Sequence, residues 1–177
     1  MRKRRILPQK LVLAPGQRIL DIGCGWGGMA ITLATLEKVE VLGITLSEEQ
    51  HALAQQRAEA AGVADRVKFE LIDYRDLAMR EAGQFDRIVS VGMFEHVGAP
   101  NFDTFFRAAA NLMTADGVML LHTIGRFGKT WRDRRFHAQI YLSGWLYSRA
   151  QRNAGGQREE PADRHRCRDA TAALCAD

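Results

Sequence analysis

Five short apolar runs constrain the fold of this chain more than any other feature. They lie at residues 18–23, 39–46, 67–73, 85–93 and 117–125, and helix-like segments separate them at residues 27–38, 47–62 and 101–113. The runs are continuous rather than alternating, which is typical of strands buried on both faces of a parallel sheet. The sequence therefore predicts an α/β fold with a doubly wound, mostly parallel, Rossmann-like sheet.

The length of 177 residues is enough for one domain with a sizeable core. We expect a short helical segment at residues 1–13, a folded core at residues 14–129, and a tail at residues 130–177. The tail differs from the core in composition: it holds nine of the 25 basic side chains, all of them arginine, against six of the 21 acidic ones. Most of the net charge of +4 therefore lies in the tail, and we do not interpret it as a nucleic-acid signal.

Composition also limits the cellular setting. No run approaches 18 apolar residues, so no membrane-spanning helix is predicted. The three cysteines, Cys24, Cys167 and Cys175, are an odd number without zinc-binding spacing. We predict a cytoplasmic protein without disulfides or a metal site. The basic start "MRKRR" is equally consistent with binding to anionic lipid headgroups and with a solvated helix start.

The stretch "LDIGCGWGG" joins the first strand to the first helix. Gly23, Gly25 and Gly27 allow the backbone to turn tightly and to approach a ligand. Their G-x-G-x-G spacing, and the absence of an acid at the end of the next strand, disfavour a dinucleotide. S-adenosylmethionine remains as the candidate ligand of this loop, because the charged amino-acid end of that cofactor suits the carboxylate of Asp21.

Ser47 and Gln50 have the S-x-x-Q spacing of a capping box at a helix start. That interpretation accounts for both residues without a ligand. Gln50 could also reach a ribose hydroxyl, and the residues alone favour the cap.

Several motifs together resemble the cyclopropane-fatty-acyl-phospholipid synthases, which are similar to mycolic acid cyclopropane synthases and fatty-acid methyltransferases. They are "LDIGCGWGGMA", "GITLSEEQ", "DYRDL", "FDRIVSVGMFEHVG" and "LLHTIG", in the family's order and spacing over residues 4–129. The resemblance implies a class I methyltransferase fold and transfer of a methyl or methylene group from S-adenosylmethionine. The implied substrate is a cis double bond in a phospholipid acyl chain, so we expect an enzyme of lipid biosynthesis that associates peripherally with the membrane.

The resemblance also implies residue roles. Asp21 and the three loop glycines match the cofactor loop, and Thr45 and Gln50 match cofactor contacts, which favours the binding role of Gln50. Tyr74 and Arg75 match the adenine side.

The resemblance implies that a bound bicarbonate is the base of the reaction. Glu95 and His122 match its holders, and Ile124 matches a backbone contact. By residue type alone, His122 would more often be a buried core histidine, and Glu95 and His96 could be ordinary loop residues; we do not expect His96 to be catalytic.

The resemblance stops near Lys129, and we interpret the tail as the product of a frameshift. Read one nucleotide later, the single Trp codon at Trp131 and at Trp145 yields glycine, where the family has glycine. We expect the tail to be poorly ordered and the fold to be incomplete on this side. The strand at residues 117–125 would then form an open apolar edge, which favours a homo-oligomer or aggregation.

Two other functions stay open from the sequence: a small-molecule or fatty-acid methyltransferase, and an inactive fragment that binds S-adenosylmethionine. A divergent basic tail that binds lipid headgroups or nucleic acid is the alternative to the frameshift.

Overall fold

The computed structural model describes residues 11–124, together with the backbone of residues 142–148. Six strands form one sheet in the order β3-β2-β1-β4-β5-β6. Strands β1 (Arg18–Ile22), β2 (Glu40–Thr45), β3 (Val67–Leu71), β4 (Phe85–Val91) and β5 (Met113–Thr123) are parallel, and β6 (Leu142–Ser148) is antiparallel to β5. The predicted doubly wound, mostly parallel sheet is confirmed.

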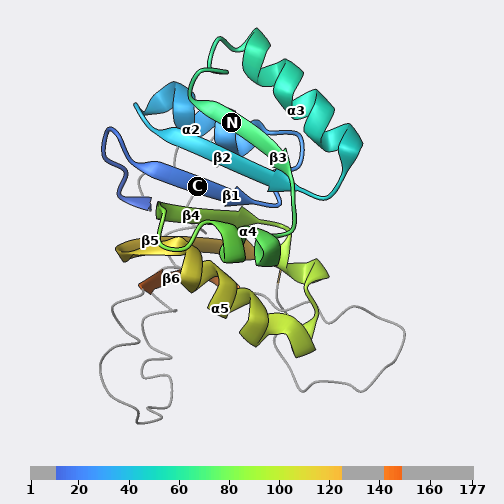
Figure 1. The fold of residues 1–177 in the computed structure, drawn as a ribbon, viewed down its shortest axis with the longest axis vertical. Coiled ribbons are helices and arrows are strands. Elements are labelled where there is room, and N and C mark those ends of the chain that lie inside the picture. Colours follow the sequence, from blue (N-terminus) through green and yellow to red (C-terminus); the bar gives the residue numbers. More distant parts are fainter. Residues whose placement is uncertain (1–10, 125–141, 149–177) are drawn as a thin grey trace, which may run out of the picture.

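Helices cover both faces of the sheet (Figure 1). Helices α2 (Gly28–Leu36) and α3 (Glu48–Ala60) lie on one face, and α4 (Tyr74–Arg80) and α5 (Phe102–Leu112) lie on the other. Neighbouring residues of β1 alternate between two cores: Ile19 packs with the α2 and α3 side, and Leu20 with the α4 and α5 side. Burial on both faces explains why the strands read as continuous apolar runs.

Local sequence signals account for most helix ends. Ser47 caps α3 by accepting a hydrogen bond from the Gln50 amide at 3.2 Å, and Gly62 follows its last turn with a positive φ of 66°. Asp73 caps α4 by accepting from the Arg75 amide at 2.8 Å. Helix α4 was not predicted from the sequence, because its seven residues are too few to show a clear helical period.

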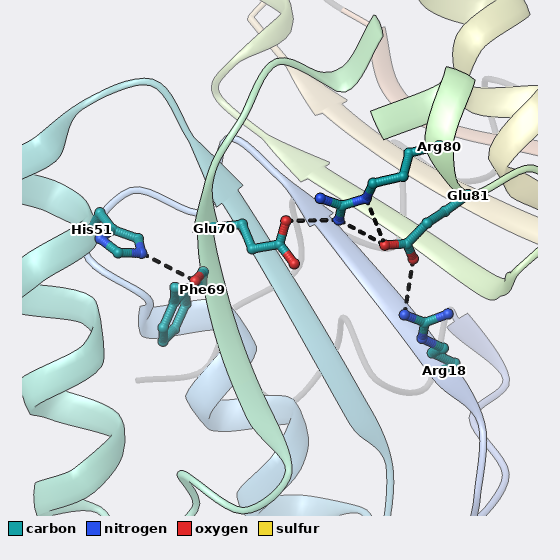
Figure 2. A network of polar contacts seen from close by, with 6 residues as sticks. All are labelled: Arg18, His51, Phe69, Glu70, Arg80 and Glu81. Carbon is teal, nitrogen blue, oxygen red and sulfur yellow. Dashed lines mark hydrogen bonds and ion pairs between the residues drawn. The ribbon is translucent and has the colours of Figure 1, made fainter. Parts of the chain in front are cut away.

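A chain of ion pairs holds α4 against the sheet (Figure 2). Arg80 contacts Glu70 of β3 at 2.7 Å and Glu81 at 2.6 Å, and Glu81 contacts Arg18 of β1 at 2.9 Å. These side chains are partly exposed, so each pair contributes about 1 kcal/mol or less. The network joins β1 and β3 to the C-terminal end of α4, and so helps to hold this end of the helix in place.

The expectation that β5 would form an open edge is wrong for the residues described. Strand β6 pairs with β5 from Val118 to Thr123, with an irregularity between Leu121 and His122. Backbone pairing supplies the hydrogen-bond partners that an edge strand would lack. Apart from β6, the tail at 130–177 lies outside the described residues, as does most of the N-terminal segment 1–13; the expected helix, poor order and frameshift stay predictions there.

Candidate active site

A pocket of about 590 Å³ opens beyond the carboxyl ends of the central strands. In a doubly wound sheet, this edge is where ligands bind. Residues that follow β1, β2, β3 and β4 contribute to its wall. The lining comprises Ile22, Gly23, Gly25, Ile44, Thr45, Leu46, Gln50, Ile72, Asp73, Tyr74, Arg75, Val91, Gly92, Met93, His96, Val97 and Asn101.

The glycine loop after β1 is held tightly by its neighbours. The amides of Gly23 and Cys24 both donate to the carbonyl oxygen of Ile44 at 3.0 Å, which ties the loop to β2. A Cβ on Gly23 would lie 2.5 Å from Met93 Cγ, and one on Gly27 would lie 2.7 Å from Phe69 Cζ. Both glycines also have a positive φ. The predicted glycine requirement therefore arises from close packing as well as from the turn.

Asp21 lies behind the loop and is 2% exposed. Its carboxylate accepts a hydrogen bond from the Ala30 amide in the first turn of α2, but Oδ2 is buried without a partner. Burial raises the pKa of Asp21 from 3.8 to about 7. A buried carboxylate without full hydrogen bonding is costly, and such groups concentrate at functional sites.

Cys24 lies in the same loop, and its role follows from its burial. Burial and the nearby Asp21 charge raise the pKa of its thiol to about 12. A thiol with that pKa is a poor nucleophile at neutral pH, in agreement with the expectation that Cys24 is a small loop residue.

The predicted capping box is only half formed. Ser47 caps the helix, but the Gln50 side chain does not return to the Ser47 amide. Gln50 Oε1 instead accepts from the Thr45 hydroxyl at 2.9 Å, while Thr45 Oγ1 accepts from the Ser47 amide at 3.2 Å. Gln50 therefore has its side-chain amide at the pocket wall, beside the buried Thr45.

The opposite wall is formed by the start of α4. Arg75 makes two hydrogen bonds of 2.8 Å with the Asp73 carboxylate, and this pairing lowers the pKa of Asp73. Tyr74 packs edge-on against Phe105 of α5 at 5.3 Å between ring centroids. This wall of the pocket thus presents an aromatic ring and a guanidinium that is paired within the protein.

A second cluster lies outside the lining of this pocket. Glu95 follows β4 in a 3₁₀ helix, η1 (Phe94–His96), which the buried Phe94 anchors in the core. Glu95 Oε1 accepts from the Ile124 amide at 2.7 Å, and Oε2 is buried without a partner. The structure thus brings Glu95 together with Ile124, two of the three residues predicted to be catalytic.

His122 lies on β5, two residues before Ile124. Its side chain is exposed, so the alternative of a buried core histidine is wrong. It makes no hydrogen bond with the side chains of residues 11–124.

Six of the eight predicted cofactor residues line the pocket: Gly23, Gly25, Thr45, Gln50, Tyr74 and Arg75. The other two, Asp21 and Gly27, support the loop from behind. His96, which is not expected to be catalytic, also lines the pocket. Its signal was its place in the same short segment as Glu95.

The described residues contain no group of three or more His, Cys, Asp or Glu side chains that could hold a metal ion. Among those same residues, no helix is long and apolar enough to cross a membrane.

Comparisons with known proteins agree with this arrangement. A family model described as mycolic acid cyclopropane synthetase matches residues 1–149. The cyclopropane-fatty-acyl-phospholipid synthase of Escherichia coli (strain K12) is 50% identical over 123 residues, which cover 70% of this chain and 30% of that protein. A probable fatty acid methyltransferase of Pseudomonas putida is 44% identical over 118 residues, which cover 67% and 29%. This chain therefore spans about 30% of the length of these relatives.

A solved structure supports the same fold. Mycolic acid cyclopropane synthase CmaA1, crystallised as a complex with SAH and CTAB, has a TM-score of 0.63 and 39% sequence identity, over 70% of this chain and 42% of that one. Together with the strand order, this likeness confirms the class I methyltransferase fold.

The burial of Asp21 predicts a pH-dependent stability that Asp21→Asn should remove. The pKa of Asp21 is raised in the folded state. Between about pH 4 and 7, the folded state therefore keeps a proton on Asp21 that the unfolded state has lost. Stability should therefore fall as the pH rises through this window. Relative to the wild type, Asp21→Asn should gain about 2 kcal/mol in free energy of unfolding between pH 5 and 8, measured by urea denaturation.

The exposed Asp76 provides the matched control, because Asp76→Asn removes one negative charge without changing a buried group. Parallel stability profiles of the wild type and Asp21→Asn from pH 5 to 8 would contradict this account of Asp21.

Proposed function

This chain belongs to the mycolic acid cyclopropane synthetase family, and we propose that its pocket binds S-adenosylmethionine. The activity proposed below is that of the whole protein, since the chain spans about 30% of the length of its E. coli relative. The observation that carries the proposal is the meeting of the glycine loop, Gln50 and Tyr74 at one pocket.

The pocket residues fit the parts of this cofactor. A Cβ on Gly25 would meet no atom within 4 Å, so the open space at the loop lies where a ligand could approach the backbone. A cationic amino-acid end would favour the ionised form of Asp21, whose unpartnered oxygen lies behind that loop. Gln50 offers an amide to the ribose, and Tyr74 offers its ring to the adenine. These assignments place the amino-acid end near β1 and the adenine near α4.

The proposed reaction is methylene transfer to a cis double bond of a phospholipid acyl chain. When bound, S-adenosylmethionine supplies an electrophilic methyl group. One alkene carbon would form a bond to that methyl carbon while the methyl–sulfur bond breaks and its electron pair goes to sulfur, so that S-adenosylhomocysteine leaves and a positive charge remains on the other alkene carbon. A proton is then lost from the new methyl group, and the freed electron pair closes the three-membered ring. The reaction therefore needs a base close to the methyl group and the exclusion of water.

We propose that Glu95 holds this base, as a bound bicarbonate. The buried Oε2 of Glu95 lacks a donor, and the O–H of bicarbonate is a donor of the right size. The Ile124 amide already donates to Glu95 Oε1, so in this arrangement Ile124 positions the Glu95 carboxylate. We propose that the exposed His122, on the adjoining strand β5, is the second side chain that binds the bicarbonate.

The substrate proposed from the family is an unsaturated phospholipid in the membrane. We propose that the protein is cytoplasmic and meets this substrate at the membrane surface, by peripheral association. Self-association remains a separate prediction, and it no longer rests on an open β5 edge.

Gly25→Val should abolish the binding of S-adenosylhomocysteine, because its side chain would fill the open space in front of the loop. Gly62→Val is a matched control: Gly62 also has a positive φ and open surroundings, but it does not line the pocket. Both variants should lose about 1 kcal/mol or more of stability from backbone strain. Isothermal titration calorimetry on the 177-residue chain should show binding by the wild type and Gly62→Val alone. Equal heats for the wild type and Gly25→Val would refute the site.

Glu95→Gln should abolish turnover and leave cofactor binding unchanged. The glutamine oxygen can still accept from the Ile124 amide, but the NH₂ group places a donor where the bicarbonate O–H requires an acceptor. We expect at least a 100-fold loss, in the range observed when one polar catalytic group is removed. A suitable enzyme is the E. coli synthase with its matching 123-residue region replaced by that of this chain.

The assay is gas chromatography of membrane fatty acids from cells that lack their own synthase. Cyclopropane products are expected from the chimera. Methyl-branched products would favour the fatty-acid methyltransferase alternative, and undiminished ring formation by Glu95→Gln would show that Glu95 does not hold the base.

A further inference from the structure

The polar side chains of the pocket differ in how many hydrogen bonds they make within the protein. Arg75 is bound to Asp73 through two nitrogen atoms, so its charge is largely matched within the protein. His96 lines the same pocket and is exposed. Among residues 11–124, no side-chain hydrogen bond or ion pair engages the His96 ring. His96 is therefore a hydrogen-bonding group of the pocket wall that is available to a ligand.

The 3₁₀ geometry of η1 places His96 at the glycine-loop end of the pocket. The His96 amide donates to the Met93 carbonyl at 2.9 Å, which closes one 3₁₀ turn. Side chains three residues apart in such a turn lie on the same face. Met93 is the residue packed against Gly23, where an added Cβ would lie 2.5 Å from Met93 Cγ. His96 therefore shares a face with the side chain that contacts the loop, and both line the pocket.

Several loop amides are already committed within the protein. The amides of Gly23 and Cys24 donate to Ile44, and the amide of Gly27 donates to the Cys24 carbonyl at 3.0 Å. An anionic group at this end of a ligand therefore finds fewer backbone donors than an open glycine loop would offer. A side-chain donor on the facing wall would compensate.

We propose that His96 binds the carboxylate of the amino-acid end of S-adenosylmethionine. The ring of His96 donates a hydrogen bond to that carboxylate, while Asp21, behind the loop, favours the ammonium group. The two charges of the amino-acid end are thereby met by η1, which follows β4, and by the end of β1. This inference rests on the proposed function, and it adds a binding residue that the family motifs do not assign.

The test compares two ligands that differ only in this group: S-adenosylmethionine and its decarboxylated form. Calorimetry on the 177-residue chain would give both dissociation constants for the wild type, His96→Ala and His96→Gln. His96→Ala should weaken binding of S-adenosylmethionine about tenfold or more, as for the loss of a hydrogen bond to a charged group. Binding of the decarboxylated ligand should change less than about twofold. His96→Gln, which keeps a donor, should recover part of the loss.

His51→Ala is the matched control, because His51 bonds the Phe69 carbonyl at 3.0 Å and does not line the pocket. The ratio of the two affinities should be the same in His51→Ala as in the wild type. Equal weakening of both ligands by His96→Ala, or no weakening of either, would overturn the role of His96. If the wild type binds neither ligand, the proposed function itself fails.

Discussion

The close packing of the glycine loop is the constraint on which the site depends. A Cβ on Gly23 would lie 2.5 Å from Met93, and one on Gly27 would lie 2.7 Å from Phe69 and 3.0 Å from Ala54, so a side chain at either position would force its neighbours to move. These contacts bring together the segments that follow β1 and β4 and the helix α3. The two hydrogen bonds to Ile44 fix the loop to β2 as well. The pocket is therefore the space left where the segments that follow the central strands meet around a glycine-rich loop.

Two buried carboxylate oxygens give the site its chemical character. Among the described residues, Asp21 Oδ2 and Glu95 Oε2 are the buried side-chain polar atoms without a hydrogen-bond partner. Each belongs to a residue that sequence motifs had already assigned to the site. Folding alone does not favour such atoms, since an unpartnered buried acceptor destabilises the native state by about 1–3 kcal/mol. A ligand that supplies the missing donor would recover this free energy, which links the local instability to binding.

The parts of the structure that could be predicted from the sequence are those that depend on nearby residues. The five apolar strands and the loop glycines are local features, and the cap at Ser47 is another. Helix α4 has a clear cap at Asp73, but it is too short to show a period. The side-chain bond of Gln50 to Thr45, in place of a full capping box, depends on how β2 meets α3. The sequence could not show the bond between Glu95 and Ile124 or the pairing of β6 with β5, because these contacts join residues far apart in the chain. The place of His96 in the pocket wall likewise depends on a distant contact, the packing of Met93 against Gly23.

A crystal structure of the chain with S-adenosylhomocysteine would test the central claim most directly, namely that the glycine loop and the start of α4 form the two ends of one cofactor site. We predict that the amino-acid end lies against Gly23 and Gly25, the ribose at Gln50, and the adenine beside Tyr74. A ligand bound in the reverse orientation, or at another place on the protein, would contradict the account.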